Sequence, residues 1–115
     1  MDDAACLWLA AKLAEHSDKP TAILMHQPPI NSAIPYIDVY KCQRGERLAE
    51  IVLRHQNVER VKCGHIHRFL QARFGGTMLV TAPSTTTAIA LRLVADAAPA
   101  SYIEPPRLPA APLDI

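Results

Sequence analysis

The chain has 115 residues, with 12 Lys and Arg against 11 Asp and Glu, and half of its residues are apolar, which predicts one small globular unit with a modest core. A formal net charge of +1 offers no broad cationic surface to a nucleic-acid polymer or an anionic membrane. The apolar stretch around residues 4–11 is far shorter than the roughly 20 residues of a membrane span, so we predict a cytoplasmic protein without membrane segments. The three cysteines match no disulfide framework or zinc-knuckle spacing, which predicts free thiols.

Apolar periodicity in the first half of the chain predicts an α/β unit. Residues 2–16 have the pattern of an amphipathic helix, and residues 21–25 form a continuous apolar run, as expected for a strand covered on both faces. A long loop over residues 27–44 precedes a second helix, at residues 45–55, and a second strand, at residues 58–63. This order predicts a βαβ crossover that places the two strands parallel and adjacent.

The second half of the chain reads as antiparallel β structure. Residues 69–82 predict a hairpin around a Gly-Gly turn, and the alternation over residues 87–94 predicts a further strand. We divide the chain into a partial domain over residues 1–95 and a final segment over residues 96–115. That segment is expected to hold one short strand near residues 101–103 and then an extended Pro-rich tail.

Three of the five histidines stand directly after predicted strands. His26 follows the first parallel strand, while His65 and His67 follow the second, and the carboxyl ends of parallel strands open into one crevice. If the second segment is extended, residues i and i+2 project to the same side about 6.6 Å apart. The sequence therefore predicts a metal or phosphate site at these histidines. His16 and His55 lie near predicted helix C-termini, where we expect structural or solvated roles.

Other interpretations of the same residues remain open. Each histidine alone can be an ordinary surface or hydrogen-bonded residue. Cys63 has the spacing to extend the histidine pair into a Cys-x-His-x-His zinc site, but a buried apolar role is more usual for cysteine. The basic side chains of Lys41, Arg44 and Arg47 can reach an anionic substrate from the long loop or can simply be solvated.

Two short segments resemble motifs of the calcineurin-like metallophosphoesterases. Residues 25–29 (MHQPP) are similar to the H-H-P-P segment of that family, and residues 63–68 (CGHIHR) to its G-H-x-H-R segment. The resemblance is to the branch of class III cyclic nucleotide phosphodiesterases and their glycerophosphodiesterase-like relatives, and it covers residues 7–95. Further similar segments are residues 34–38, 71–76 and 82–85.

This resemblance implies a four-layer α-β-β-α sandwich, of which the chain would supply the C-terminal half. It implies a dinuclear centre of Fe, Mn, Zn or Co, in which His26 and His65 bind one ion and His67 binds the other. Gln27 stands where this branch commonly has a second histidine. The upstream D-x-H, G-D and G-N-H-[DE] segments of the family have no counterpart in the chain.

The implied activity is hydrolysis of a small phosphodiester, with 3′,5′-cyclic nucleotides as one candidate substrate, by a metal-activated water. No catalytic residue other than the three metal ligands is assigned, and the isolated chain is expected to have little activity. Exposed apolar surface is expected to make it a homo-oligomer. Two alternatives stay open: a mononuclear zinc hydrolase with three histidine ligands, and a non-catalytic module that self-associates.

Overall fold

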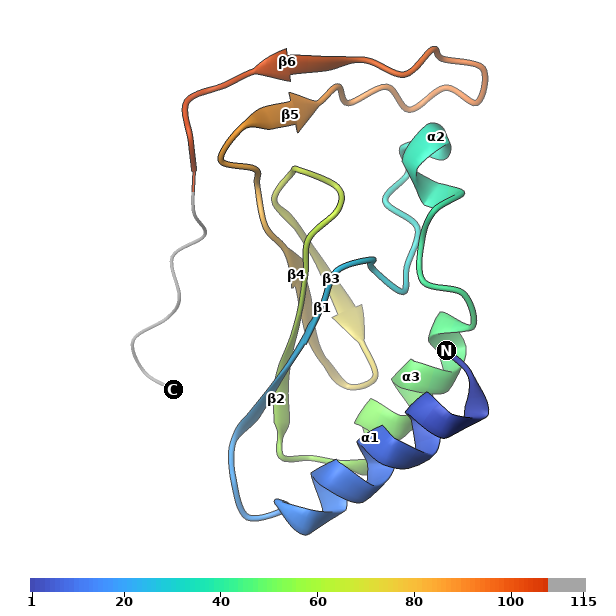
Figure 1. The fold of residues 1–115 in the computed structure, drawn as a ribbon, viewed down its shortest axis with the longest axis vertical. Coiled ribbons are helices and arrows are strands. Elements are labelled where there is room, and N and C mark those ends of the chain that lie inside the picture. The colour runs from blue at the N-terminus through green and yellow to red at the C-terminus, as the bar shows by residue number, and fades with distance from the viewer. Residues whose placement is uncertain (108–115) are drawn as a thin grey trace.

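The computed structural model describes residues 1–107, so Pro109 and Pro112 of the predicted Pro-rich tail lie outside the described residues. Within that range, no helix combines the length and the apolar character needed to cross a membrane. The elements in chain order (Figure 1) are α1 (Asp3–Glu15), β1 (Thr21–Met25), α2 (Pro35–Asp38), α3 (Gly45–Arg54), β2 (Val58–Cys63), β3 (Leu70–Phe74), β4 (Thr77–Thr81), β5 (Thr87–Ile89) and β6 (Ser101–Ile103).

The strands form one mixed sheet and one small antiparallel pair. The main sheet has the order β1-β2-β4-β3, with β1 and β4 both parallel to β2 and β3 antiparallel to β4. The predicted βαβ crossover and the predicted hairpin are therefore confirmed. β5 and β6 pair with each other in a separate two-stranded sheet, which confirms a short strand near residues 101–103.

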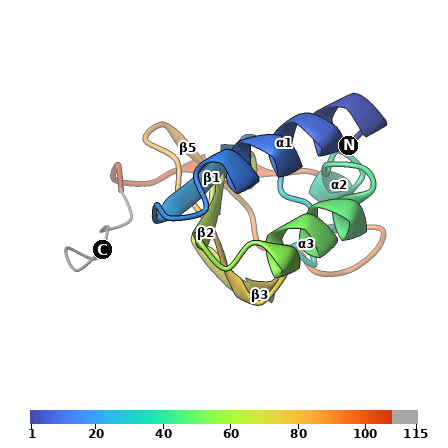
Figure 2. The ribbon, with the colours of Figure 1, turned by 90° about the horizontal axis from the view of Figure 1, so that it is seen from below.

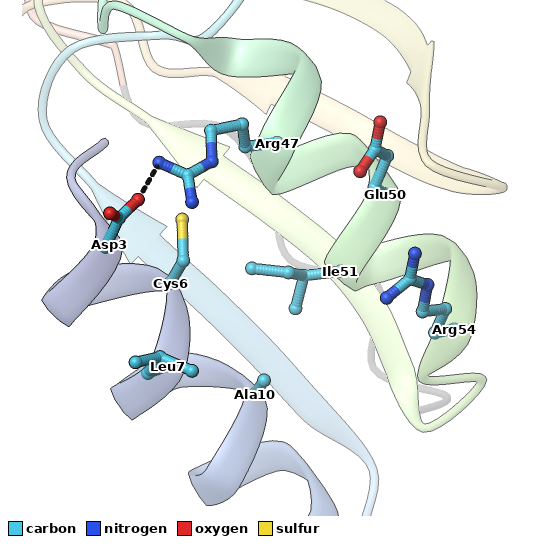
Figure 3. Close-up of a pocket in the computed structure, with 8 residues that line it drawn as sticks. All are labelled: Asp3, Cys6, Leu7, Ala10, Arg47, Glu50, Ile51 and Arg54. Atoms are coloured by element: carbon cyan, nitrogen blue, oxygen red, sulfur yellow. Dashed lines mark ion pairs between the residues drawn. The ribbon is translucent and has the colours of Figure 1, made fainter.

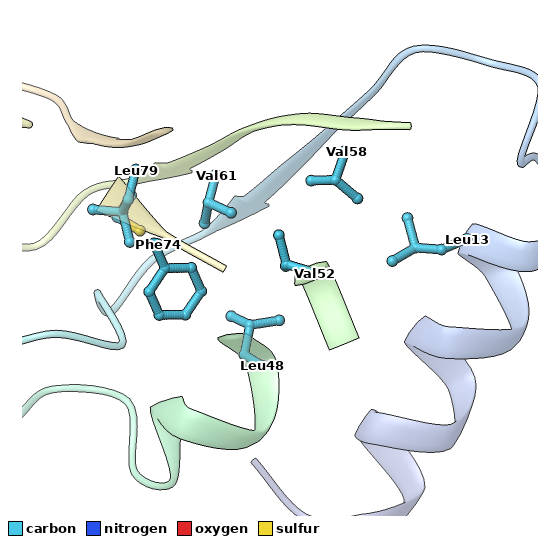
Figure 4. Packing of buried hydrophobic residues seen from close by; sticks show 8 residues of the cluster. Leu13, Leu48, Val52, Val58, Val61, Phe74 and Leu79 are labelled. Carbon is cyan, nitrogen blue, oxygen red and sulfur yellow. The ribbon is translucent and has the colours of Figure 1, made fainter. Parts of the chain in front are cut away.

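The core lies between the main sheet and the two long helices, which pack side by side (Figure 2). Leu13 of α1 and Leu48 and Val52 of α3 meet Val61 and Leu79 from the centre of the sheet (Figure 4). At the start of α1, the Asp2 carboxylate accepts a hydrogen bond from the Ala5 amide at 2.8 Å. Such a cap satisfies an amide that has no partner inside the helix.

The expectation that the first strand is covered on both faces is wrong for the described residues. β1 alternates between half-buried and exposed positions, and Leu24 is 77% exposed. The reason is that both long helices pack on one side of the sheet, which leaves the side chains on the other side of β1 exposed. A continuous apolar run does not by itself report whether a second layer is present.

The predicted strand over residues 87–94 is shorter in the structure. β5 ends at Ile89, and the apolar side chains of Leu91 and Leu93 are exposed. Alternation predicts a buried face only where another element covers it, and here the chain leaves β5 for a long excursion before it returns as β6 (Figure 1).

The long loop between β1 and α3 contains a four-residue helix that periodicity does not predict. α2 starts at Pro35, a position where the fixed φ of proline favours a helix start. One turn is too short to show a 3.6-residue period. The Asp38 carboxylate braces the loop by accepting hydrogen bonds from the amide and the hydroxyl of Ser32, at 2.7 and 2.6 Å.

Candidate metal centre

The parallel register of β1 and β2 brings two of the predicted histidines together. Met25 is paired with Cys63 at the ends of these strands, and one residue further on the Gly64 amide donates to the His26 carbonyl at 3.0 Å. The imidazoles of His26 and His65 then lie edge to face, with ring centroids 5.3 Å apart. The prediction that the two strand ends bring these side chains together is confirmed for this pair.

Gly64 allows this close approach because it has no side chain. A Cβ atom at position 64 would lie only 3.2 Å from Nδ1 of His26, which is tighter than ordinary van der Waals contact. The absence of a side chain at Gly64 therefore lets the backbone come close just before the histidines.

The segment with His65 and His67 is not extended, so the argument from i and i+2 alternation is wrong. The Ile66 amide donates to the Gly64 carbonyl at 2.8 Å, which closes a three-residue turn around His65. His65 has φ +68° and His67 has φ +57°. These left-handed conformations are uncommon for residues other than glycine and cluster at functional sites.

The environment of His65 keeps its ring available as a neutral ligand. Nε2 of His65 is buried and has no hydrogen-bond partner among residues 1–107. Burial, followed by the nearby His26 and His67, lowers the pKa of His65 below its ordinary value. A neutral imidazole with an unshared lone pair is the form that binds a metal ion.

His67 is oriented by the main chain of β5. Nδ1 of His67 lies 2.9 Å from the Thr87 carbonyl oxygen, and because a carbonyl can only accept, Nδ1 carries the proton. That tautomer leaves Nε2 as the nitrogen with a lone pair. Sequence reasoning did not identify Thr87, since a backbone carbonyl has no residue signature.

The three histidines are not gathered around one point. Within the described range, no three His, Cys, Asp or Glu side chains form a group that can hold a single metal ion. The structure thus brings the rings of His26 and His65 into contact, and His67 does not join them in a three-ligand group. It offers no geometric support for a mononuclear centre with three histidine ligands.

Cys63 has the apolar role. Its side chain is buried within the hydrophobic core, and desolvation, with a smaller contribution from Cys42, raises the pKa of Cys63 to about 12. A thiol must ionise to bind zinc, so the Cys-x-His-x-His alternative is not supported.

Two of the three basic residues considered for substrate binding, Lys41 and Arg47, have other contacts. Lys41 donates to the side chain of Asn31 at 2.6 Å. Arg47 forms an ion pair with Asp3 at 2.7 Å across a pocket of about 430 Å³ between α1 and α3 (Figure 3). Among the described residues that line this pocket there is no histidine, so Arg47 belongs to the interface of the two helices.

The chain is similar in sequence to proteins named as phosphodiesterases, although no protein-family model matches it. It is 34% identical over 85 residues to the glycerophosphodiester phosphodiesterase GpdQ of Enterobacter lignolyticus, covering 74% of this chain and 31% of the relative. It is 35% identical over 101 residues to a probable GpdQ of Arcobacter nitrofigilis, covering 87% and 37%. It is 30% identical over 78 residues to the 3′,5′-cyclic adenosine monophosphate phosphodiesterase CpdA of Escherichia coli, covering 68% and 28%. The chain spans about a third of the length of these curated relatives.

Proposed function

We propose that the chain forms the C-terminal part of a dinuclear-metal phosphodiesterase of the calcineurin-like metallophosphoesterase class, because the relatives that it matches are named as phosphodiesterases. Glycerophosphodiesters and 3′,5′-cyclic nucleotides are the candidate substrates, because the relatives act on compounds of these two kinds. We further propose that residues 1–95 form the C-terminal half of a four-layer α-β-β-α sandwich, and that the enzyme is cytoplasmic.

The observation that carries the proposal is the His26–His65 pair, with its rings in contact and a buried nitrogen that lacks a partner. A divalent ion fits this pair, because each imidazole can supply one neutral nitrogen ligand. His67 would serve the second ion through Nε2, while Thr87 holds its other nitrogen. When bound, such ions polarise a phosphoryl oxygen and lower the pKa of a bound water.

These residues supply only part of the coordination that two ions need. Two divalent ions carry four positive charges, and neutral imidazoles cancel none of them, so carboxylate ligands are required as well. Within residues 1–107, no acidic side chain joins the histidines in a ligand group. We therefore infer that the remaining ligands come from outside the described residues, and that the chain alone has little phosphodiesterase activity.

Zinc titration of the chain, followed by calorimetry, tests this proposal. We expect one Zn²⁺ site whose affinity falls at least about tenfold in His26→Ala and in His65→Ala, because each variant removes one of the ligands. His16→Ala and His55→Ala are the matched controls, since both residues cap helix C-termini. Equal zinc affinity in all five proteins would contradict the proposal.

Turnover measured on the same preparations distinguishes the dinuclear centre from the mononuclear zinc hydrolase. With an activated phosphodiester as substrate, the chain should show no metal-dependent turnover above that of the same zinc solution without protein. Esterase activity with one tightly held ion, lost in His67→Ala as well as in the other two variants, would favour the mononuclear zinc hydrolase over the dinuclear centre.

We propose that the chain self-associates through the uncovered face of its edge strand. Leu24 is exposed on β1, and an edge strand with apolar side chains favours pairing with another chain. Leu24→Lys should therefore shift the chain toward monomer in sedimentation velocity, because lysine protects strand edges. Leu53→Lys, at an exposed position of α3, is the matched control. An unchanged distribution in Leu24→Lys would argue against this face.

A further inference from the structure

The loop that carries His65 and His67 is fastened to the β5–β6 sheet by two consecutive side chains. His67 donates to the Thr87 carbonyl, and Arg68 donates through Nε to the Ile89 carbonyl, two residues further along β5. Arg68 also donates through its guanidinium to the hydroxyl of Tyr102 on β6, with Cζ 5.6 Å from the centre of the Tyr102 ring. One arginine thus contacts both strands of the pair.

The β5–β6 sheet has a second attachment at its other end. The Tyr36 hydroxyl of α2 lies 3.2 Å from the Ala90 carbonyl and 3.0 Å from the Ala100 carbonyl, directly beyond the ends of the two strands. Figure 1 shows the pair lying above α2 and the main sheet. The sheet therefore connects α2, in the loop between β1 and α3, to the loop that carries His65 and His67.

The backbone around the two histidines requires such support. Left-handed conformations are energetically costly for residues other than glycine and persist only where neighbouring contacts determine them. On the C-terminal side of His67, the described contacts are the Thr81 hydroxyl, which donates to the Arg68 carbonyl at 2.6 Å, and the Arg68 guanidinium itself.

We propose that Arg68 is a positioning residue for the candidate metal centre, because by holding Ile89 it keeps the Thr87 carbonyl against Nδ1 of His67. Its contact selects the His67 tautomer with a free Nε2 and keeps the loop in its left-handed path. The planar guanidinium suits this task, since it offers several donors in a fixed arrangement and can face an aromatic ring. The metal-ligand part of this inference rests on the proposed function.

Heteronuclear NMR of the imidazole nitrogens tests the inference on the metal-free chain, at about pH 8, where imidazoles are neutral. Wild type should show His67 with the proton on Nδ1, and Arg68→Gln should show a mixture of tautomers. Arg92→Gln is the matched control, because Arg92 also donates to a backbone carbonyl, that of Ala98 at 2.9 Å, without any contact to the histidine loop. Tyr102→Phe, which keeps the Ile89 contact, should give a smaller change.

Zinc affinity is the second measurement. Because the loop that Arg68 fastens also carries His65, Arg68→Gln should weaken Zn²⁺ binding at the His26–His65 pair about tenfold, within the range usual for residues that orient a ligand, while Arg92→Gln should not. A His67 tautomer and a zinc affinity that are the same in Arg68→Gln as in Arg92→Gln would overturn the inference. If the tautomer changes in Arg68→Gln while His26→Ala and His65→Ala bind zinc like wild type, the positioning role stands and the proposed function fails.

Discussion

Replacing Ile66 by alanine is expected to lower the free energy of unfolding by about 2–5 kcal/mol, the range for truncating a fully buried aliphatic side chain. Ile66 is 0% exposed and lies between His65 and His67. Its burial fixes the centre of a loop in which both flanking residues have left-handed φ. Truncation of the side chain leaves a cavity that the close-packed surroundings fill poorly. The loss of unfolding free energy should therefore exceed the free energy of transferring the removed methyl and methylene groups out of water.

Urea denaturation followed by circular dichroism measures this loss. Ile66→Val removes one methylene and should cost only about 0.5–1.5 kcal/mol. Leu53→Ala, at a side chain that is 65% exposed, should stay within about 0.5 kcal/mol of wild type. If Ile66→Ala is no less stable than Leu53→Ala, the buried isoleucine does not anchor the histidine loop.

The sequence is sufficient to predict the elements that bury one regular face. The helices α1 and α3, the parallel strands β1 and β2 and the hairpin of β3 and β4 all follow from apolar periodicity and turn residues. The contact between His26 and His65 follows from the same reasoning, because parallel pairing of two strands puts their carboxyl ends side by side.

The parts that could not be predicted depend on contacts between residues far apart in the chain. The turn around His65 is set by a backbone hydrogen bond and a positive φ, which no apolar pattern encodes. The partner of His67 is the carbonyl of Thr87, twenty residues away. The exposure of Leu24 depends on whether a layer covers β1, and a strand's own sequence does not contain that information.

The position of the loop after His26 depends on a second close backbone contact. Gly45, the first residue of α3, is buried against Pro29, and a Cβ atom at position 45 would lie 2.1 Å from the Pro29 carbonyl oxygen. The Cys42 amide also donates to the Pro28 carbonyl at 3.0 Å. The start of α3 therefore holds the proline segment that follows the histidine.

Gly45→Ala tests this contact, because two effects of the substitution oppose each other. In a helix, alanine is favoured over glycine by up to about 1 kcal/mol. The overlap with a backbone oxygen cannot be relieved by a side-chain rotation, and such overpacking costs about 1–3 kcal/mol or more. We expect the overlap to dominate, so that Gly45→Ala unfolds at lower urea concentration than wild type and binds zinc more weakly through a displaced His26. Glu50→Ala, at an exposed position of the same helix, should change neither. A Gly45→Ala protein as stable as Glu50→Ala would mean that the loop can move away from α3, and that His26 is positioned by its strand alone.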